Sequence, residues 1–333
     1  MDFSHVLHKQ IVETHEGRVL NKLSWKRRRN VLYFEGLFAE FVKKGKKEEM
    51  RKLGEEWIKI SSSGVWPNLV MKLPFKFKFS LFRKVWKSIG AIEDISFSRK
   101  GKKIRIEVLG EGIADLIGLN EFSFGVFGGM LEFLTGKKVK YVKKVKEGNY
   151  FVYDYLVTDE KIKIKTKSKS YYLKMNKLPV QKGFTLKDAL KFHVFNIKKG
   201  KIYFRGDHLT PVEGTIFHLA SYTSHCKELH NLAYNYFNKK LKESTEIEKL
   251  KLLKTLLQVM GWGLINFRVS EKEIAVSIKH LPPGFQLEED NYEFLIQTIS
   301  GFMMAVNKKF KFKKSKFSKQ LMQLNLNFSK QAK

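Results

Sequence analysis

The 333-residue sequence is poor in cysteine, proline and acidic residues. Cys226 is its only cysteine, which excludes an intrachain disulfide framework and a cysteine-rich zinc site. Six prolines and the lack of a Gly/Ser tract argue against long linkers. No run of about 18 or more apolar residues occurs, so we expect no transmembrane segment. The first residues lack the basic start and the apolar core of a secretory signal, and we expect a cytoplasmic protein.

Catalytic motifs are missing as well. The chain has no phosphate-binding Gly-x-x-x-x-Gly-Lys-Ser/Thr loop, no Gly-x-Ser-x-Gly elbow and no dinucleotide fingerprint. Acidic pairs such as Glu55-Glu56 and Glu93-Asp94 are most simply helix ends, caps or solvated faces. We therefore predict that the protein is not an enzyme, with no catalytic residues and no cofactor.

One group of histidine and cysteine residues is a candidate metal site. His218, His225, Cys226 and His230 are predicted to lie on one helix, where Cys226 and His230 are one turn apart and could hold a metal. With about 100° per residue, however, His230 lies well away from the face that His218 and His225 share, and no fourth ligand is evident. We predict ordinary packing or solvation for these side chains and no metal site.

The apolar content is high for such a basic chain. Hydrophobic residues make up 43% of the sequence, and 28 phenylalanines contribute to an aromatic content of 14%. This much apolar surface can fill cores, so a largely disordered chain is excluded despite the charge. At roughly 100–200 residues per domain, the length suggests two domains.

The sequence contains an internal repeat. Residues 120–134 can be aligned with residues 292–306, and the alignment places Gly129 opposite Gly301 within two apolar helices. A glycine inside a helix indicates that a neighbouring backbone approaches closely there. A repeat of this kind has to be sought first, because it decides how the whole chain is organised.

Other blocks recur in the same order. Each half predicts a helix closed by glycine, at 82–90 and at 253–261. A hairpin follows in both, and its second strand alternates with the period of a half-buried strand, at Ile104, Ile106 and Val108 and at Ile274, Val276 and Ile278. Basic and aromatic residues then alternate, at 138–141 and 309–312, and the starts of the halves correspond at 16–20 and 199–203.

We therefore predict an α+β fold of two tandem copies of a mixed helix and antiparallel-sheet domain that arose by internal duplication. The predicted boundaries are residues 1–157 for the first unit, 158–196 for a basic connecting segment and 197–333 for the second unit with its basic tail. Lysine and isoleucine alternate from Lys161 onward, which predicts an edge strand whose lysines face water.

Several segments carry a resemblance to a known family. Gly261-Trp-Gly263 ends a helix and enters a hairpin, the helix of 292–306 with its internal glycine follows, and Lys308-Lys-Phe-Lys-Phe312 comes after it. Residues 127–138 and 147–153 show the same kind of pattern of apolar residues and glycines in the first copy. Together these segments resemble the 4-vinyl-reductase-type small-molecule-binding domain, whose fold is shared with subunits of the TRAPP trafficking complex.

This resemblance implies a compact domain, often paired, with a pocket for an apolar ligand between helices and sheet. Family members commonly carry cysteines around the strand that corresponds to residues 147–153, where this chain has none. A thiol or metal role of those cysteines therefore does not transfer. A lysine-heavy, apolar chain with this domain type also suggests an archaeal source.

The strongest functional signal is the formal charge of +31, which results from 64 basic and 33 acidic residues. Self-repulsion destabilises a compact basic protein, and a polyanion that neutralises the charge relieves it. Lysine enrichment can also reflect a hot habitat or a biased genome, although glutamate usually rises with lysine in hyperthermophile proteins. Two long stretches, 57–92 and 294–333, contain no acidic residue, whereas a solvated face normally mixes signs.

We predict that the basic runs contact phosphates. Around Pro74 we expect an extended strand that turns Phe75, Phe77 and Phe79 toward a core and the lysines between them away from it. The alternative is that these phenylalanines form a platform on which nucleic-acid bases stack. The residues predicted to bind nucleic acid are Lys26, Arg27, Arg28, Arg29, Lys76, Lys78, Arg83, Lys84, Lys87, Lys161, Lys163, Lys165, Lys167, Lys169, Lys308, Lys309, Lys311, Lys313, Lys314 and Lys316.

Structured RNA suits these runs better than other polyanions do. Lysine is a hydrated point charge that contacts phosphates rather than reading bases. The chain shows no recognition helix or zinc finger for a DNA groove, and its basic residues are not concentrated on one amphipathic helix as in membrane-surface proteins. Ribosomal RNA is the most abundant structured RNA surface in a cell. The main hypothesis is a protein that binds a ribosomal subunit and holds it inactive in the manner of a hibernation factor, or bridges subunits as a homodimer.

Two further hypotheses stay open. The resemblance favours a sensor that binds an apolar small ligand and regulates transcription or another partner. It is also compatible with a scaffold that acts like trafficking-complex subunits at anionic membranes.

Overall fold

The structure is a computed structural model of the chain that describes residues 11–14, 18–21, 29–62, 72–88, 90–162, 186–198, 201–270, 272–284, 287 and 289–330, and all structural statements below concern these residues. The first half contains β1 (Ile11–Thr14), β2 (Arg18–Asn21), β3 (Arg29–Phe34), α2 (Glu35–Lys44), α3 (Lys47–Ser62), α5 (Phe75–Ser88), β4 (Asp94–Lys100), β5 (Lys103–Leu109), α6 (Gly112–Ile117), α7 (Glu121–Thr135), β6 (Lys137–Glu147) and β7 (Tyr150–Lys161). The second half contains α9 (Leu186–Lys191), β8 (Asn196–Lys198), β9 (Lys201–Phe204), β10 (Asp207–Glu213), α10 (Thr215–Ala220), a 3₁₀ turn (Cys226–Glu228), α11 (Leu229–Lys240), α12 (Glu246–Val259), β11 (Leu264–Val269), β12 (Glu273–Lys279), α13 (Glu293–Val306), β13 (Phe310–Ser318) and β14 (Gln323–Lys330).

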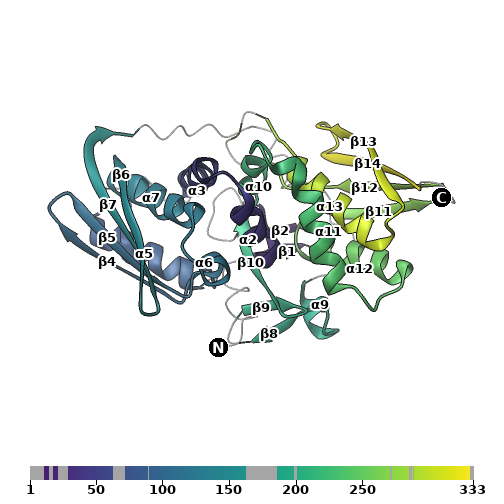
Figure 1. Cartoon of the computed structure of the whole chain (residues 1–333), viewed down its shortest axis with the longest axis horizontal. Helices are drawn as coiled ribbons and strands as arrows, with labels where there is room; N and C mark the ends of the chain where they lie inside the picture. The colour runs from purple at the N-terminus through teal and green to yellow at the C-terminus, as the bar shows by residue number, and fades with distance from the viewer. Residues whose placement is uncertain are drawn as a thin grey trace.

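Helices combine with three antiparallel sheets, which confirms the predicted α+β class (Figure 1). The central sheet has the strand order β1-β2-β3-β10-β9-β8, and the antiparallel pair β3–β10 joins the two halves of the chain within it. An outer sheet lies in each half, with the orders β4-β5-β7-β6 and β11-β12-β14-β13. Helices α5 and α7 pack on the first outer sheet, and α12 and α13 pack on the second.

The connectivity of the first half recurs in the second. Each half contributes a three-stranded meander to the central sheet, then helices, a hairpin, an apolar helix and a second hairpin. In both outer sheets the second strands of the two hairpins lie side by side in the middle, as β5 with β7 and as β12 with β14. This recurrence is what the predicted duplication requires, while the origin of the repeat stays a prediction.

The alternating strands of the repeat are confirmed. Strand β5 buries Ile104, Ile106 and Val108 and turns the residues between them outward, and β12 does the same with its own alternating Ile and Val residues. A strand with this pattern covers a core with one face and leaves the other to solvent, because successive side chains point to opposite sides.

The helix glycines lie at close crossings, as the sequence predicts. Helix α7 crosses α3 at Gly129, where a Cβ atom would lie 2.5 Å from the carbonyl oxygen of Glu55. Helix α13 crosses α11 at Gly301, where a Cβ atom would lie 2.3 Å from the carbonyl oxygen of His230. Both distances are shorter than side chains tolerate, so the two crossings depend on glycine in the same way.

The predicted strand around Pro74 is wrong, because residues 75–88 form helix α5. Alternating Phe and Lys residues suggested a period of two, but the residues that pack inward follow helical spacing. Phe79 and Phe82 are each 3% exposed, whereas Phe77 is 53% exposed and points to solvent. Phe75 and Trp86 continue the same helical stripe, with their rings 6.0 Å from Phe79 and 4.7 Å from Phe82.

The single helix predicted for His218 to His230 is also wrong. Helix α10 ends at Ala220, and the chain turns before Cys226 opens the 3₁₀ turn and His230 joins α11. The hydroxyl of Ser221, just after α10, donates to the carbonyls of Phe217 and Asn291, so this end of the helix is held against the residues before α13. In the described part of the chain, no three or more His, Cys, Asp or Glu side chains are grouped to hold a metal.

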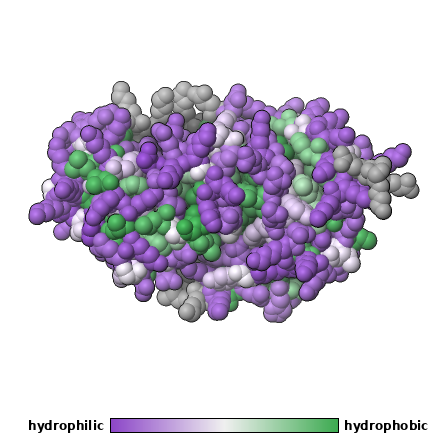
Figure 2. Space-filling view, in the orientation of Figure 1, coloured by the Kyte–Doolittle hydropathy of each residue, from purple (hydrophilic) through white to green (hydrophobic). Residues whose placement is uncertain are grey.

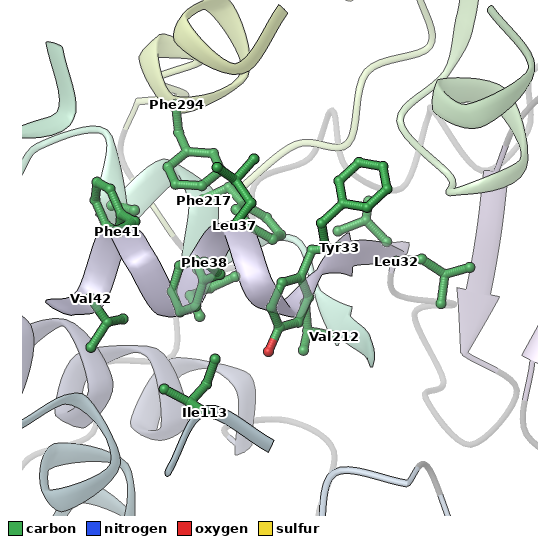
Figure 3. Packing of buried hydrophobic residues seen from close by; sticks show 14 of the residues in the cluster. Leu32, Tyr33, Leu37, Phe38, Phe41, Val42, Ile113, Val212, Phe217 and Phe294 are labelled. Carbon is green, nitrogen blue, oxygen red and sulfur yellow. The ribbon is translucent and has the colours of Figure 1, made fainter. Parts of the chain in front are cut away.

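One continuous core connects the two halves. Figure 3 shows Phe38 and Phe41 of α2 beside Phe217 of α10 and Phe294 of α13, and the rings of Phe41 and Phe294 are 5.2 Å apart. The indole of Trp262 donates to the carbonyl of Leu32 at 3.1 Å, which ties the start of the second outer sheet to β3. The halves therefore share buried surface as well as the β3–β10 pair.

The segment predicted to connect the halves is described only at its ends. Strand β7 continues to Lys161, α9 lies before residue 197, and β8 (Asn196–Lys198) spans the predicted boundary at that residue. Lys161 is not on an edge strand, because β7 lies between β5 and β6 and pairs Lys161 with Lys137. Residues 163–185 lie outside the described part. Among the helices that the structure does describe, none is both long and apolar enough to cross a membrane.

Candidate polyanion-binding surface

The outer face of the C-terminal sheet is polar and basic. In β14, Leu324, Leu326 and Phe328 are buried, so Asn325 and Asn327 lie on the opposite face. Strand register places further residues beside them, and we call the whole set the basic sheet face: Leu264, Asn266, Arg268, Glu273, Ala275, Ser277, Lys279, Lys311, Lys314, Lys316, Ser318, Gln323, Asn325, Asn327 and Ser329.

Edge strand β13 supplies most of the positive charge on this face. Lys311 pairs with Ser329, Lys314 with Asn327 and Lys316 with Asn325, so all three lysines lie on the outer side. A β-bulge between Phe312 and Lys314 adds Lys313 to the same edge. These four lysines are exposed and form no ion pair with any described residue, and no acidic residue occurs from 294 to 333.

Cations lie at both edges of the basic sheet face with uncharged groups between them. Arg268 of β11 is opposite Ala275, Ala275 is opposite Asn327, and Asn327 is opposite Lys314. This row crosses three strand spacings, which is about 14 Å. Glu273 is the one acidic residue among the described members of the face, so the cations outnumber the acid and the face keeps a net positive field.

Hydrogen bonds order the amides of this face. The Gln323 amide donates to the Ser277 hydroxyl at 2.9 Å and to the Asn325 side-chain oxygen at 2.8 Å. These bonds orient the Asn325 amide, because its oxygen is engaged as an acceptor. An ordered amide beside an unbalanced ammonium group is a common arrangement for contacting phosphate and sugar oxygens.

The residues predicted at 308–316 lie on the turn before β13 and on β13 itself. Lys308 places its ammonium over the ring of Tyr234 at 5.8 Å, at the end of α13 where β13 begins. Lys309 follows in the same turn, and its backbone N–H donates to the Asn307 side chain. The predicted residues fall in four runs, at 26–29, 76–87, 161–169 and 308–316, and the last is the one whose members the structure describes together and without acidic partners.

The cluster on α5 is less available. Arg83 donates to both carboxylate oxygens of Asp94 at 2.7 Å, and Lys87 lies 3.3 Å from the same carboxylate. The hydrogen bonds from Arg83 lower the pKa of Asp94 to about 2, so Asp94 remains charged and offsets these cations. Lys78 is 8% exposed, and its ammonium donates to the carbonyl of Leu134.

The other predicted residues separate into two groups. Lys76 and Lys84 are exposed on α5, and Lys161 is exposed at the end of β7. Arg29 belongs to β3, but its side chain is outside the described set. The remaining predicted residues, Lys26, Arg27, Arg28, Lys163, Lys165, Lys167 and Lys169, lie outside the described residues.

Sequence reasoning missed the uncharged and β11 members of the basic sheet face. The alternation in residues 323–329 of polar with apolar side chains contained the signal, since every polar position is an amide or a hydroxyl. Arg268 and Lys279 could not be assigned to the face from their own strands, because only the register of β11, β12 and β14 shows that they share a face with the lysines of β13.

The apolar pocket implied by the family resemblance has little room here. A cavity lined by Tyr33, Phe38, Phe217, Trp262 and Phe294 measures about 30 Å³, which is the space of about one water molecule. The rings of Phe217 and Trp262 pack against each other in its wall, with their centroids 4.8 Å apart. An apolar ligand would have to displace these rings.

No protein-family model, no curated protein and no solved structure matches this chain. The resemblance to 4-vinyl-reductase-type domains therefore stays a prediction.

Proposed function

We propose that the basic sheet face binds structured RNA, and that the RNA belongs to a ribosomal subunit. One observation supports this above the others: lysines and an arginine border a sheet face of amides and hydroxyls, with one acidic residue among the described members. A compact patch of unbalanced positive charge attracts phosphates and loses affinity as salt rises.

The chemistry of the face favours RNA over a membrane surface. Amide and hydroxyl groups at Ser277, Asn325 and Asn327 can contact sugar hydroxyls and phosphates, which are the groups that an RNA helix exposes in its shallow groove. Membrane-surface proteins instead insert apolar side chains beside their basic residues. Figure 2 shows apolar residues gathering left of centre, where Figure 1 places α5 and α6, while hydrophilic side chains cover most of the end where the second outer sheet lies.

A ribosomal subunit is the proposed partner because ribosomal RNA offers the largest structured phosphate surface in a cell. Lysine-dominated contacts recognise phosphate positions rather than base sequence. A protein that binds in this way could hold a subunit inactive without any catalytic group.

The test compares two edge strands that occupy equivalent places in the two outer sheets. Variant Lys311→Gln/Lys314→Gln/Lys316→Gln removes three charges from β13, and the control Lys138→Gln/Lys140→Gln/Lys143→Gln removes three from β6. We expect the β13 variant to bind ribosomal subunits at least tenfold more weakly in gradient co-sedimentation and in titration with rRNA fragments. Its salt dependence should also fall, by about one phosphate contact for each lysine lost.

The β6 control should stay within about threefold of the wild type, because its lysines are largely engaged by acids on the neighbouring strand. Lys138 pairs with Glu160, and Lys143 lies 3.7 Å from Asp154. Equal losses in the two variants would show that total charge and not the basic sheet face drives binding. A wild-type protein that stays at the top of the gradient at low salt, or that binds anionic vesicles but no RNA, would refute the proposed function.

A further inference from the structure

A second charged site lies in the first outer sheet, away from the basic sheet face. A cleft of about 410 Å³ opens where the turn between β4 and β5, the start of β6, the end of β7 and the first residue of α5 come together. Its lining includes Lys78, Arg99, Lys102 and Lys137, with Asp159 as the acidic member among the lining residues. The volume falls in the range of small-ligand pockets.

A carboxylate already occupies the position where an anion would bind. Asp159 pairs with Lys102, and one of its oxygens lies 3.6 Å from the ammonium of Lys137. The hydrogen bond from Lys102 lowers the pKa of Asp159, so this carboxylate is held as an anion between the two lysines. Its side chain is 73% exposed, which leaves it free to swing out when a stronger anion arrives.

The inner wall of the cleft adds a cation that is shielded from solvent. Lys78 reaches the cleft from α5 and is anchored by its hydrogen bond to the carbonyl of Leu134. Burial lowers the pKa of Lys78, because desolvation disfavours the ammonium. A bound anion would favour the charged ammonium of Lys78, and this ion pair would be stronger at the shielded position than at an exposed lysine.

An aromatic ring borders the cations. Phe75 lines the cleft, and its ring stands edge-on to Phe97, with centroids 4.9 Å apart and planes at 89°. Phe79 also packs beside it at 6.0 Å, so the ring is held in place. A fixed aromatic ring beside a group of cations is the combination that binds a base and its phosphate together.

We propose that this cleft binds a 5′-phosphorylated nucleotide, with the phosphate between Lys102 and Lys137 in place of Asp159 and the base against Phe75. The ligand can be a free mononucleotide or the 5′ end of an RNA chain, since both present the same chemistry. The proposal does not depend on RNA binding by the basic sheet face, because the two sites share no residue.

Titration calorimetry on the full chain tests the proposal with AMP, adenosine and inorganic phosphate as probes. We expect AMP to bind at one site per chain, at least tenfold more tightly than either adenosine or phosphate. Replacing Phe75 by Leu should weaken AMP at least fivefold and leave the weak binding of phosphate within twofold. A 5′-phosphorylated RNA trinucleotide that binds more tightly than AMP assigns the site to a chain end, and weaker binding assigns it to the free nucleotide.

Charge variants of opposite sign make the proposal falsifiable. Lys102→Gln/Lys137→Gln should weaken AMP at least tenfold, whereas Asp159→Asn should strengthen it at least threefold by removing the competing carboxylate. The controls make the same charge changes on the outer face of the same sheet, as Lys140→Gln/Lys143→Gln and Asp154→Asn, and should stay within twofold. Thermal unfolding of each variant verifies that it is folded.

Three results would overturn the proposal. The first is the absence of saturable AMP binding to the wild type at millimolar concentration. The second is an equal effect of the cleft variants and their controls, which would assign AMP binding to the overall charge. The third is adenosine binding as tightly as AMP, which would leave the phosphate without a role.

Discussion

The two outer sheets have the same strand order but different outer faces. On the sheet of β4, β5, β7 and β6, cations alternate with acids, and Arg105 contacts both Asp154 at 3.0 Å and Glu147 at 3.4 Å. On the sheet of β11, β12, β14 and β13, most positions between the cations hold amides and hydroxyls instead, and Glu273 is the one acid among the described members of the face. Exposed ion pairs of the first kind add little stability, but they cancel the field of their face.

This difference shows that the excess charge of the chain is not spread evenly. The first sheet face resembles an ordinary solvated surface with mixed signs. The second keeps its positive field, because the carboxylates that would offset it are replaced by neutral groups. A shared scaffold therefore carries one neutral and one basic surface, and the basic one is the better candidate for a polyanion.

The largest expected effect is on the free energy of unfolding, and it comes from a carboxyl group that the first half has and the second lacks. Glu111 follows β5 and Leu281 follows β12 in the corresponding place, after residues with positive φ at Gly110 and His280. Glu111 is buried, and desolvation raises its pKa from 4.5 to about 7. The folded state therefore holds a proton that the unfolded state releases above pH 4.5, so stability falls as the pH rises from 4.5 to 7.

Replacing Glu111 by Gln should remove this loss, which amounts to about 3 kcal/mol at pH 8. Urea unfolding at pH 4 to 8 measures it, and the control Glu107→Gln on the exposed sheet face should keep the wild-type slope. The expectation fails if E111Q is no more stable than the wild type at pH 8.

The next effect tests whether the two helix crossings are equivalent. Gly129→Ala and Gly301→Ala should each lower the free energy of unfolding by about 1–3 kcal/mol, because the added methyl group forces α7 from α3 or α13 from α11. Chemical denaturation measures both, with Lys254→Ala on the exposed side of α12 as the control. If one glycine tolerates alanine without loss while the other does not, the crossings are not equivalent despite their shared position.

The smallest effect is expected from two variants that exchange the charge character of the two sheet faces. Asn325→Asp/Asn327→Asp adds acids to the basic sheet face and should weaken RNA binding about tenfold, since each new charge lies near lysines in a solvent-exposed setting. Glu107→Gln/Asp154→Asn removes acids from the first sheet face and should strengthen binding by about threefold or less. Fluorescence anisotropy at two salt concentrations measures the RNA affinity of both variants. If the first variant binds RNA as tightly as the wild type, RNA does not bind at this face.

Much of the local structure was predictable because it depends on short-range patterns. The burial of Ile104 and Ile106 follows from alternation, and the crossing at Gly129 follows from a glycine within an apolar helix. The same reasoning erred at Phe75 to Phe79, where a few alternating residues fit two periods, and only the continuation to Phe82 and Trp86 separates them. It erred between His218 and His230 because α10 ends at Ala220 and the chain turns before Cys226, which the spacing of the histidines does not reveal.

By itself, the sequence determined the amount of positive charge, the acid-free stretches and the repeated order of helices and hairpins. Only the tertiary structure decided which cations share a surface, since alternation assigns a face within one strand but register assigns neighbours across strands. Arg268 and Lys314 are far apart in the chain, yet Ala275 and Asn327 align them in one row. Lys78 shows the converse, because Lys76 and Phe77 just before it are exposed while packing against α7 buries its ammonium.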